Sequence, residues 1–111
     1  YFYGPVPVTR ALTKKEMDKD YTGNTGRIII ERFRKLDPMA VPAVLVAHHG
    51  PFTWGKDAMD AVHTSVALET VAEMALRTVV LRPGIKPIPT FVLDKHFHRK
   101  HGPGAYYGQK G

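Results

Sequence analysis

The sequence of 111 residues contains no cysteine. Without thiols it cannot form a disulfide scaffold or a thiolate zinc site, and the absence fits a reducing compartment such as the cytoplasm. No apolar run approaches the roughly 18–20 residues that a membrane span requires, and the residues given contain no basic and apolar signal segment. The sequence therefore favours a cytoplasmic protein that does not span a membrane.

An initial methionine is also missing, because the chain begins with Tyr1. An aromatic start of this kind is typical of the interior of a longer chain. Hydrophobic residues make up 43% of the sequence, which is enough for a folded core. A chain of this length is expected to form one domain at most.

Acidic residues are outnumbered, with 16 lysines and arginines against 10 aspartates and glutamates, and the formal net charge is +6. Such a charge is compatible with nucleic acid, a membrane surface or anionic metabolites. The basic residues are spread along the chain and form no stripe interleaved with aromatic residues. We therefore expect no nucleic-acid partner.

Proline, glycine and apolar spacing predict the order of the elements. Pro5 and Pro7 exclude a helix from residues 1–8. A capping-box pattern at residues 13–16 predicts a short helix to residue 20, and Gly23 with Asn24 predicts a turn over residues 21–25. The further expected elements are a helix over 27–36, a buried strand over 41–48, a short strand over 52–54, a long helix over 57–81 and a final helix over 91–100.

Strands mixed with long helices favour the α/β class. Within residues 27–36 a strand stays open as an alternative, because three consecutive isoleucines suit one. The glycine-rich residues 102–111 are expected to form a flexible tail.

A histidine pair, His48 and His49, ends the predicted strand beside the Gly50-Pro51 turn. Strand ends next to tight turns are common places for metal and substrate sites. Successive strand residues point to opposite faces, so the two imidazoles are not expected to bind one metal together. The alternative is that both are hydrogen-bonded structural histidines.

A second histidine group lies in the expected final helix. His96 and His98 would be about 200° apart around a helix, which makes them poor partners for one ion. A catalytic zinc site normally has three protein ligands, so a metal site in this chain would be incomplete. Together with Arg99, Lys100 and His101, these residues form either a solvated helix face or a phosphate-binding edge.

Two adjacent tyrosines, Tyr106 and Tyr107, lie in the glycine-flanked tail. A phenol with a pKa near 10 is a weak acid by itself, but close to a cation it can act as a general acid or base. Alternatively, an aromatic pair of this kind anchors the tail to a partner subunit.

Four segments resemble the L-ribulose-5-phosphate 4-epimerase family. Residues 48–63, HHGPFTWGKDAMDAVH, are similar to its signature HGPFAWGK…DAVH, and residues 93–109, LDKHFHRKHGPGAYYGQ, resemble its C-terminal LDKHYLRKHG…AYYGQ. YFYGPVPVTR and TGNTGRIIIERF align with the middle of the family. The resemblance implies the class II aldolase and adducin-like superfamily, and hence part of a three-layer α/β/α sandwich with a mixed sheet.

The same resemblance implies that residues 1–111 are the C-terminal portion of a single domain. The N-terminal half would carry the phosphate-binding loop and a His-x-His pair that supplies two zinc ligands. An acid/base aspartate would come immediately before Tyr1. The chain departs from the family pattern at two places: Ala47-His48 replaces the usual His-Ser, and Thr22 stands where glutamate is frequent.

Residue by residue, the resemblance implies three site residues. His49 would be the third ligand of Zn²⁺ or another divalent metal, Tyr107 the acid/base tyrosine that reaches a neighbouring subunit, and His96 a residue near the substrate's phosphate end. It also implies a homotetramer that acts on a phosphorylated ketopentose.

The implied reaction converts L-ribulose 5-phosphate to D-xylulose 5-phosphate. The C4 proton is not adjacent to the C2 carbonyl, so inversion is expected through retro-aldol cleavage of the C3–C4 bond and re-addition to the other face of the aldehyde. A divalent metal suits the enediolate oxygens that cleavage produces. The alternatives are a class II sugar-phosphate aldolase and a non-catalytic adducin-like interaction module. The 111-residue segment alone is expected to be inactive.

Overall fold

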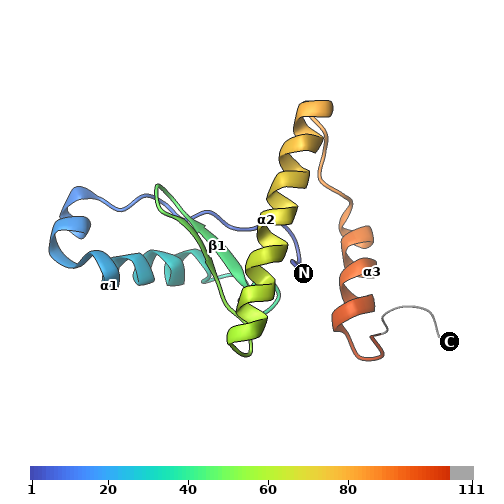
Figure 1. Cartoon of the computed structure of the whole chain (residues 1–111), viewed down its shortest axis with the longest axis horizontal. Coiled ribbons are helices and arrows are strands. Elements are labelled where there is room, and N and C mark those ends of the chain that lie inside the picture. The colour runs from blue at the N-terminus through green and yellow to red at the C-terminus, as the bar shows by residue number, and fades with distance from the viewer. Residues whose placement is uncertain (106–111) are drawn as a thin grey trace.

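The computed structural model describes residues 1–105, which form three helices and one β-hairpin (Figure 1). In chain order these are α1 at Lys14–Arg32, β1 at Ala43–Val46, β2 at Gly50–Thr53, α2 at Ala58–Leu81 and α3 at Thr90–His101. Both element types of the expected α/β class are present. None of the described helices is long and apolar enough to cross a membrane.

Helix α1 is a single kinked helix where the sequence predicted a helix, a turn and a second helix. The capping box is confirmed, because the Thr13 side chain accepts from the Glu16 amide while the Glu16 carboxylate accepts from the Thr13 amide at 2.8 Å. At Asp20 the backbone leaves helical geometry (φ −161°, ψ 75°), and its carboxylate accepts from the Gly23 amide at 3.1 Å.

Asp20 thus acts as an internal N-cap that restarts the helix. The predicted turn over residues 21–25 is therefore wrong, and the strand alternative for residues 27–36 is excluded, since residues 27–32 are helical. A Cβ at Gly23 would overlap the Asp20 carboxylate, so any larger residue here would require that carboxylate to shift.

Strand β1 forms hydrogen bonds along both of its edges. On one side it pairs antiparallel with β2, with Ala43 opposite Thr53. On the other, Val8 forms a parallel bridge to Leu45, whose amide and carbonyl bond to Pro7 and Thr9 at 2.9 Å each. The three segments therefore pair in both parallel and antiparallel directions.

The described core is small and lies between α1 and the hairpin. Ile28, Val44 and Val46 are buried. Four partly buried side chains pack against them: Leu12, Ile29, Phe33 and Trp54. Helix α2 also contacts the hairpin and buries Thr64 and Leu68.

Helix α2 exposes much more apolar surface than it buries. Leu68 is 6% exposed, whereas Leu76, Val80 and Leu81 are 66%, 70% and 86% exposed. Further exposed apolar residues of this helix are Met59, Val62, Val66, Val71, Met74 and Val79. A helix that is apolar around most of its circumference is typical of a protein interior. We call these nine exposed residues the α2 surface.

We expect polar substitution of the α2 surface to reduce self-association of the 111-residue chain. Leu76→Gln combined with Val80→Gln removes exposed apolar area and should change the free energy of unfolding by only about 0.5 kcal/mol, as is usual for surface sites. Sedimentation velocity measures the association. The control Leu68→Gln buries an unpaired amide and should unfold the chain instead. Unchanged sedimentation of the double variant would contradict the expectation.

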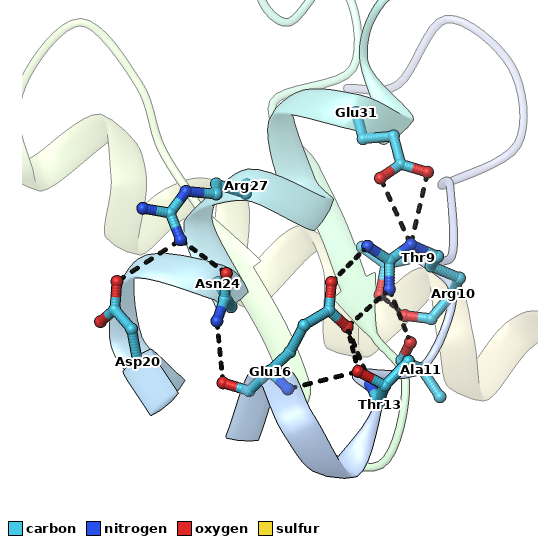
Figure 2. A network of polar contacts seen from close by, with 9 residues as sticks. All are labelled: Thr9, Arg10, Ala11, Thr13, Glu16, Asp20, Asn24, Arg27 and Glu31. Carbon is cyan, nitrogen blue, oxygen red and sulfur yellow. Dashed lines mark hydrogen bonds and ion pairs between the residues drawn. The ribbon is translucent and has the colours of Figure 1, made fainter. Parts of the chain in front are cut away.

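A polar network joins the segment before α1 to both parts of that helix (Figure 2). The Arg10 guanidinium donates to the two Glu16 carboxylate oxygens at 3.0 and 2.9 Å and to Glu31 at 3.3 Å. Across the kink, the Asn24 amide donates to the Glu16 carbonyl at 2.8 Å. Hydrogen bonds from Arg10, followed by the Thr13 amide, lower the pKa of Glu16 from 4.5 to about 2.

This pKa predicts a loss of stability in acid. Because the folded-state pKa of Glu16 lies below its ordinary value, its contribution is complete above pH 4.5 and is lost as the pH falls toward 2. Urea unfolding of Glu16→Gln, followed by circular dichroism between pH 2 and 6, should show a weaker pH dependence than the unsubstituted chain. The exposed Glu69 provides a matched control, and an equal flattening in Glu69→Gln would refute the assignment.

Candidate active-site residues

The histidine pair lies in the turn of the hairpin and not on the strand. The strand ends at Val46, two residues before the predicted end, because the His49 amide donates to the Val46 carbonyl at 3.0 Å and closes a turn. His48 has φ of 62°, a left-handed conformation that histidine adopts more readily than most residues. The prediction that the two imidazoles occupy opposite faces of a strand is therefore wrong, since β1 ends at Val46.

Gly50 follows with φ of 132°, a conformation that side chains with a Cβ rarely adopt. Glycine at this position is what lets the chain enter β2 directly after the histidines. Gly50 is thus required by turn geometry, whereas the two histidines are not.

The imidazole of His49 is exposed and supported on one face by an aromatic ring. It stacks on Phe52, with ring centroids 5.1 Å apart and planes at 24°. Among the described residues no side-chain hydrogen bond reaches a ring nitrogen of His48 or His49. Within residues 1–105 both rings therefore lack a hydrogen-bond partner, and the role of His49 as a metal ligand stays a prediction.

Trp54 fixes the hairpin that carries this turn. Its indole N–H donates to the Pro38 carbonyl at 2.8 Å, and its ring meets Phe33 edge-on at a centroid distance of 5.2 Å. The Thr53 hydroxyl donates to the Ala61 carbonyl of α2 at 3.1 Å. The residues after the histidines thus anchor the turn to both neighbouring helices, a role that the sequence alone did not suggest.

Gly55 permits the chain to pass closely over the start of α2. A Cβ at this position would lie 2.6 Å from an Asp60 carboxylate oxygen. Asp60 accepts from the Lys56 amide at 3.1 Å, while Asp57 caps α2 by accepting from the Asp60 amide at 2.8 Å. The FTWGKD sequence is therefore a rigid junction between the hairpin and α2.

The final helix is confirmed and carries the second histidine group. His96 is exposed on α3 and makes no hydrogen bond or ring contact with the described residues. His101 stacks on Phe97 at 4.4 Å, and His98 lies 6.0 Å from the Tyr3 ring. A shallow cavity of about 480 Å³ on this helix is lined by Phe91, Asp94, Lys95, His98 and Arg99.

The structure does not bring the predicted site residues together. His49 lies in the hairpin turn and His96 on α3, while Tyr107 lies outside the described residues. Within residues 1–105, no three histidine, aspartate or glutamate side chains are grouped so that they could hold a metal ion. One imidazole cannot fix a tetrahedral zinc ion, so these residues do not form a complete zinc site by themselves.

A comparison with known families and proteins identifies the family of this chain. Residues 1–76 match the family described as Class II Aldolase and Adducin N-terminal domain. The chain belongs to the class II aldolase and adducin family, as its motifs indicated.

Among curated proteins, the chain is similar to the L-ribulose-5-phosphate 4-epimerases UlaF of several Salmonella strains. It is 51% identical over 110 residues to those of Salmonella paratyphi A and Salmonella typhi, and 50% identical to that of Salmonella choleraesuis. Each alignment covers 99% of this chain and 48% of the relative. The chain therefore spans about half the length of the curated relatives it matches.

Proposed function

We propose that this chain is part of a zinc-dependent enzyme that epimerises L-ribulose 5-phosphate to D-xylulose 5-phosphate. The observation that carries the proposal is the 51% identity over 110 residues to relatives named as L-ribulose-5-phosphate 4-epimerases. The proposal concerns a protein of the relatives' full length, because this chain covers 48% of them.

In this proposal residues 1–111 are the C-terminal portion of a single domain built as a three-layer α/β/α sandwich with a mixed sheet. Two observations support it. Strand β1 pairs in both directions, as in a mixed sheet. The α2 surface offers an apolar face on which a further layer can pack, as an interior helix requires.

The chemistry assigned to this chain is the reversible breaking of the C3–C4 bond. Cleavage produces an enediolate and glycolaldehyde phosphate, and re-addition to the opposite face of the aldehyde inverts C4. Tyr107 exchanges a proton with the aldehyde oxygen on one face, a task suited to a positioned phenol. His96 lies toward the phosphate end of the substrate.

His49 is proposed as one zinc ligand, since it is exposed at the hairpin turn with its ring held against Phe52. The other donors would come from polypeptide outside this chain, because no three histidine, aspartate or glutamate side chains of residues 1–105 are grouped to hold a metal ion. The expected substrate is a phosphorylated ketopentose and the expected assembly a cytoplasmic homotetramer.

A class II sugar-phosphate aldolase is the second candidate, because the matching family is described as class II aldolase and adducin. The test uses the chain extended to the full length of its relatives and given L-ribulose 5-phosphate. Accumulation of D-xylulose 5-phosphate supports the epimerase. Release of glycolaldehyde phosphate without the epimer favours the aldolase, and absence of both reactions and of bound zinc points to an adducin-like interaction module.

A further inference from the structure

Tyr3 joins the N-terminal segment to α3 across 91 residues of sequence. Its phenolic O–H donates to the carboxylate of Asp94. Its ring packs against Phe97 at a centroid distance of 5.0 Å and an angle of 57°, and lies 6.0 Å from the ring of His98. No residue of α3 is fully buried in the described structure, so these contacts are important for its placement.

The three contacted residues lie on one side of α3. Asp94, Phe97 and His98 are spaced i, i+3 and i+4, which places them next to one another on a helix. His96 lies about 200° around the axis from Asp94 and therefore on another side. Because a helix turns as a unit, the direction of His96 follows from how the Tyr3 side is held.

A directional bond and a ring contact together resist rotation of the helix better than either alone. The hydrogen bond to a carboxylate fixes the phenol at Asp94, and such charge-assisted bonds are stronger than neutral ones. About one helical turn after Asp94, the contact between the Tyr3 and Phe97 rings fixes α3 at a second position. The hydrogen bond to Asp94, with smaller effects of desolvation and charge, raises the pKa of Tyr3.

We propose that Tyr3 is a positioning residue whose contacts with Asp94, Phe97 and His98 set the rotation of α3 and thereby the direction of His96. Tyr3 itself touches no reacting atom. The consequence for His96 depends on the proposed function, whereas the fixing of α3 does not.

Hydrogen exchange of the 111-residue chain tests the fixing of α3 without any assay of activity. Tyr3→Phe keeps the ring and removes the hydroxyl, and should speed exchange of the amides in residues 94–101 by about three- to tenfold, the value of one hydrogen bond. Tyr3→Leu also removes the ring and should speed it further. Tyr21→Phe is the matched control, because the Tyr21 side chain is 43% exposed on α1 and makes no hydrogen bond or ring contact with the described residues.

A double-mutant cycle separates loss of the Tyr3–Asp94 hydrogen bond from a general destabilisation of the chain. Asp94→Leu should match Tyr3→Phe, and the double variant should exchange no faster than either. Asp94→Asn should lie between Asp94→Leu and the unsubstituted chain, because its amide oxygen still accepts but without the charge. Exchange in α3 that is the same with and without the Tyr3 hydroxyl, including complete lack of protection in both, would overturn the proposal. So would additive effects in the double variant.

The second measurement uses the chain extended to the full length of its relatives. Tyr3→Phe should raise the KM for L-ribulose 5-phosphate several-fold more than it lowers kcat, with zinc content unchanged. Faster exchange with an unchanged KM would overturn the role assigned to His96. If the unsubstituted extended protein does not epimerise, the proposed function fails, and the exchange experiment still decides the role of Tyr3 in holding α3.

Discussion

Tyr107→Phe is expected to abolish most epimerisation in the chain extended to the length of its relatives. A positioned general acid or base typically contributes about 10²- to 10⁴-fold in rate, and phenylalanine keeps the ring while removing the only proton it can exchange. Turnover of L-ribulose 5-phosphate should fall by this order with little change in zinc content. The KM should change less than kcat, because the phenol acts on the aldehyde oxygen during reaction.

Tyr106→Phe is the matched control for this experiment, since it makes the same chemical change one residue earlier in the same tail. It should retain turnover close to that of the unsubstituted protein. Wild-type turnover in Tyr107→Phe would remove Tyr107 from the mechanism. An equal loss in both variants would show that the pair anchors the tail instead of exchanging a proton.

His49→Asn is expected to lower zinc affinity and turnover together in the same extended protein. Even residues that only orient a metal ligand typically change metal affinity by about 10- to 100-fold, so loss of a direct ligand should exceed about 100-fold. Zinc content after dialysis, measured by mass spectrometry of the metal, and kcat on L-ribulose 5-phosphate are the two readouts.

His48→Asn provides the matched control, because asparagine tolerates the left-handed conformation that His48 adopts with φ of 62°. The turn should therefore form, and zinc should still bind. Normal zinc content in His49→Asn, or its loss in His48→Asn, would reverse the assignment of the two histidines. The ring of His49 is held by stacking on Phe52, whereas the ring of His48 makes no such contact with the described residues.

Local signals in the sequence predicted the helices well. The capping box of Thr13 and Glu16 was found as expected, because it requires only residues within one turn. The long helix expected over residues 57–81 spans Ala58–Leu81, and the final helix is present at Thr90–His101. Helix caps and proline breaks depend on neighbouring residues, so they can be recognised without the fold.

The kink at Asp20 shows where local signals misled the prediction. Gly23 and Asn24 are typical turn residues, yet both are helical because the Asp20 carboxylate accepts from the Gly23 amide. The glycine leaves room for that carboxylate and does not form a turn. The conformation of Gly23 was therefore decided by its contact with Asp20 and not by the general preference of glycine for turns.

The sequence by itself determined α2, α3, the capping box of α1 and the family, since caps, apolar spacing and long motifs are properties of nearby residues. The turn predicted at Gly50-Pro51 is instead part of β2, because the chain already turns at residues 47–49. Only the tertiary structure showed that Trp54 is bonded to Pro38, that Tyr3 is bonded to Asp94, and that His49 lies in a turn stacked on Phe52. These contacts join residues that are far apart in the sequence or fix the direction of a side chain. Neither can be obtained from the spacing of residues along the chain.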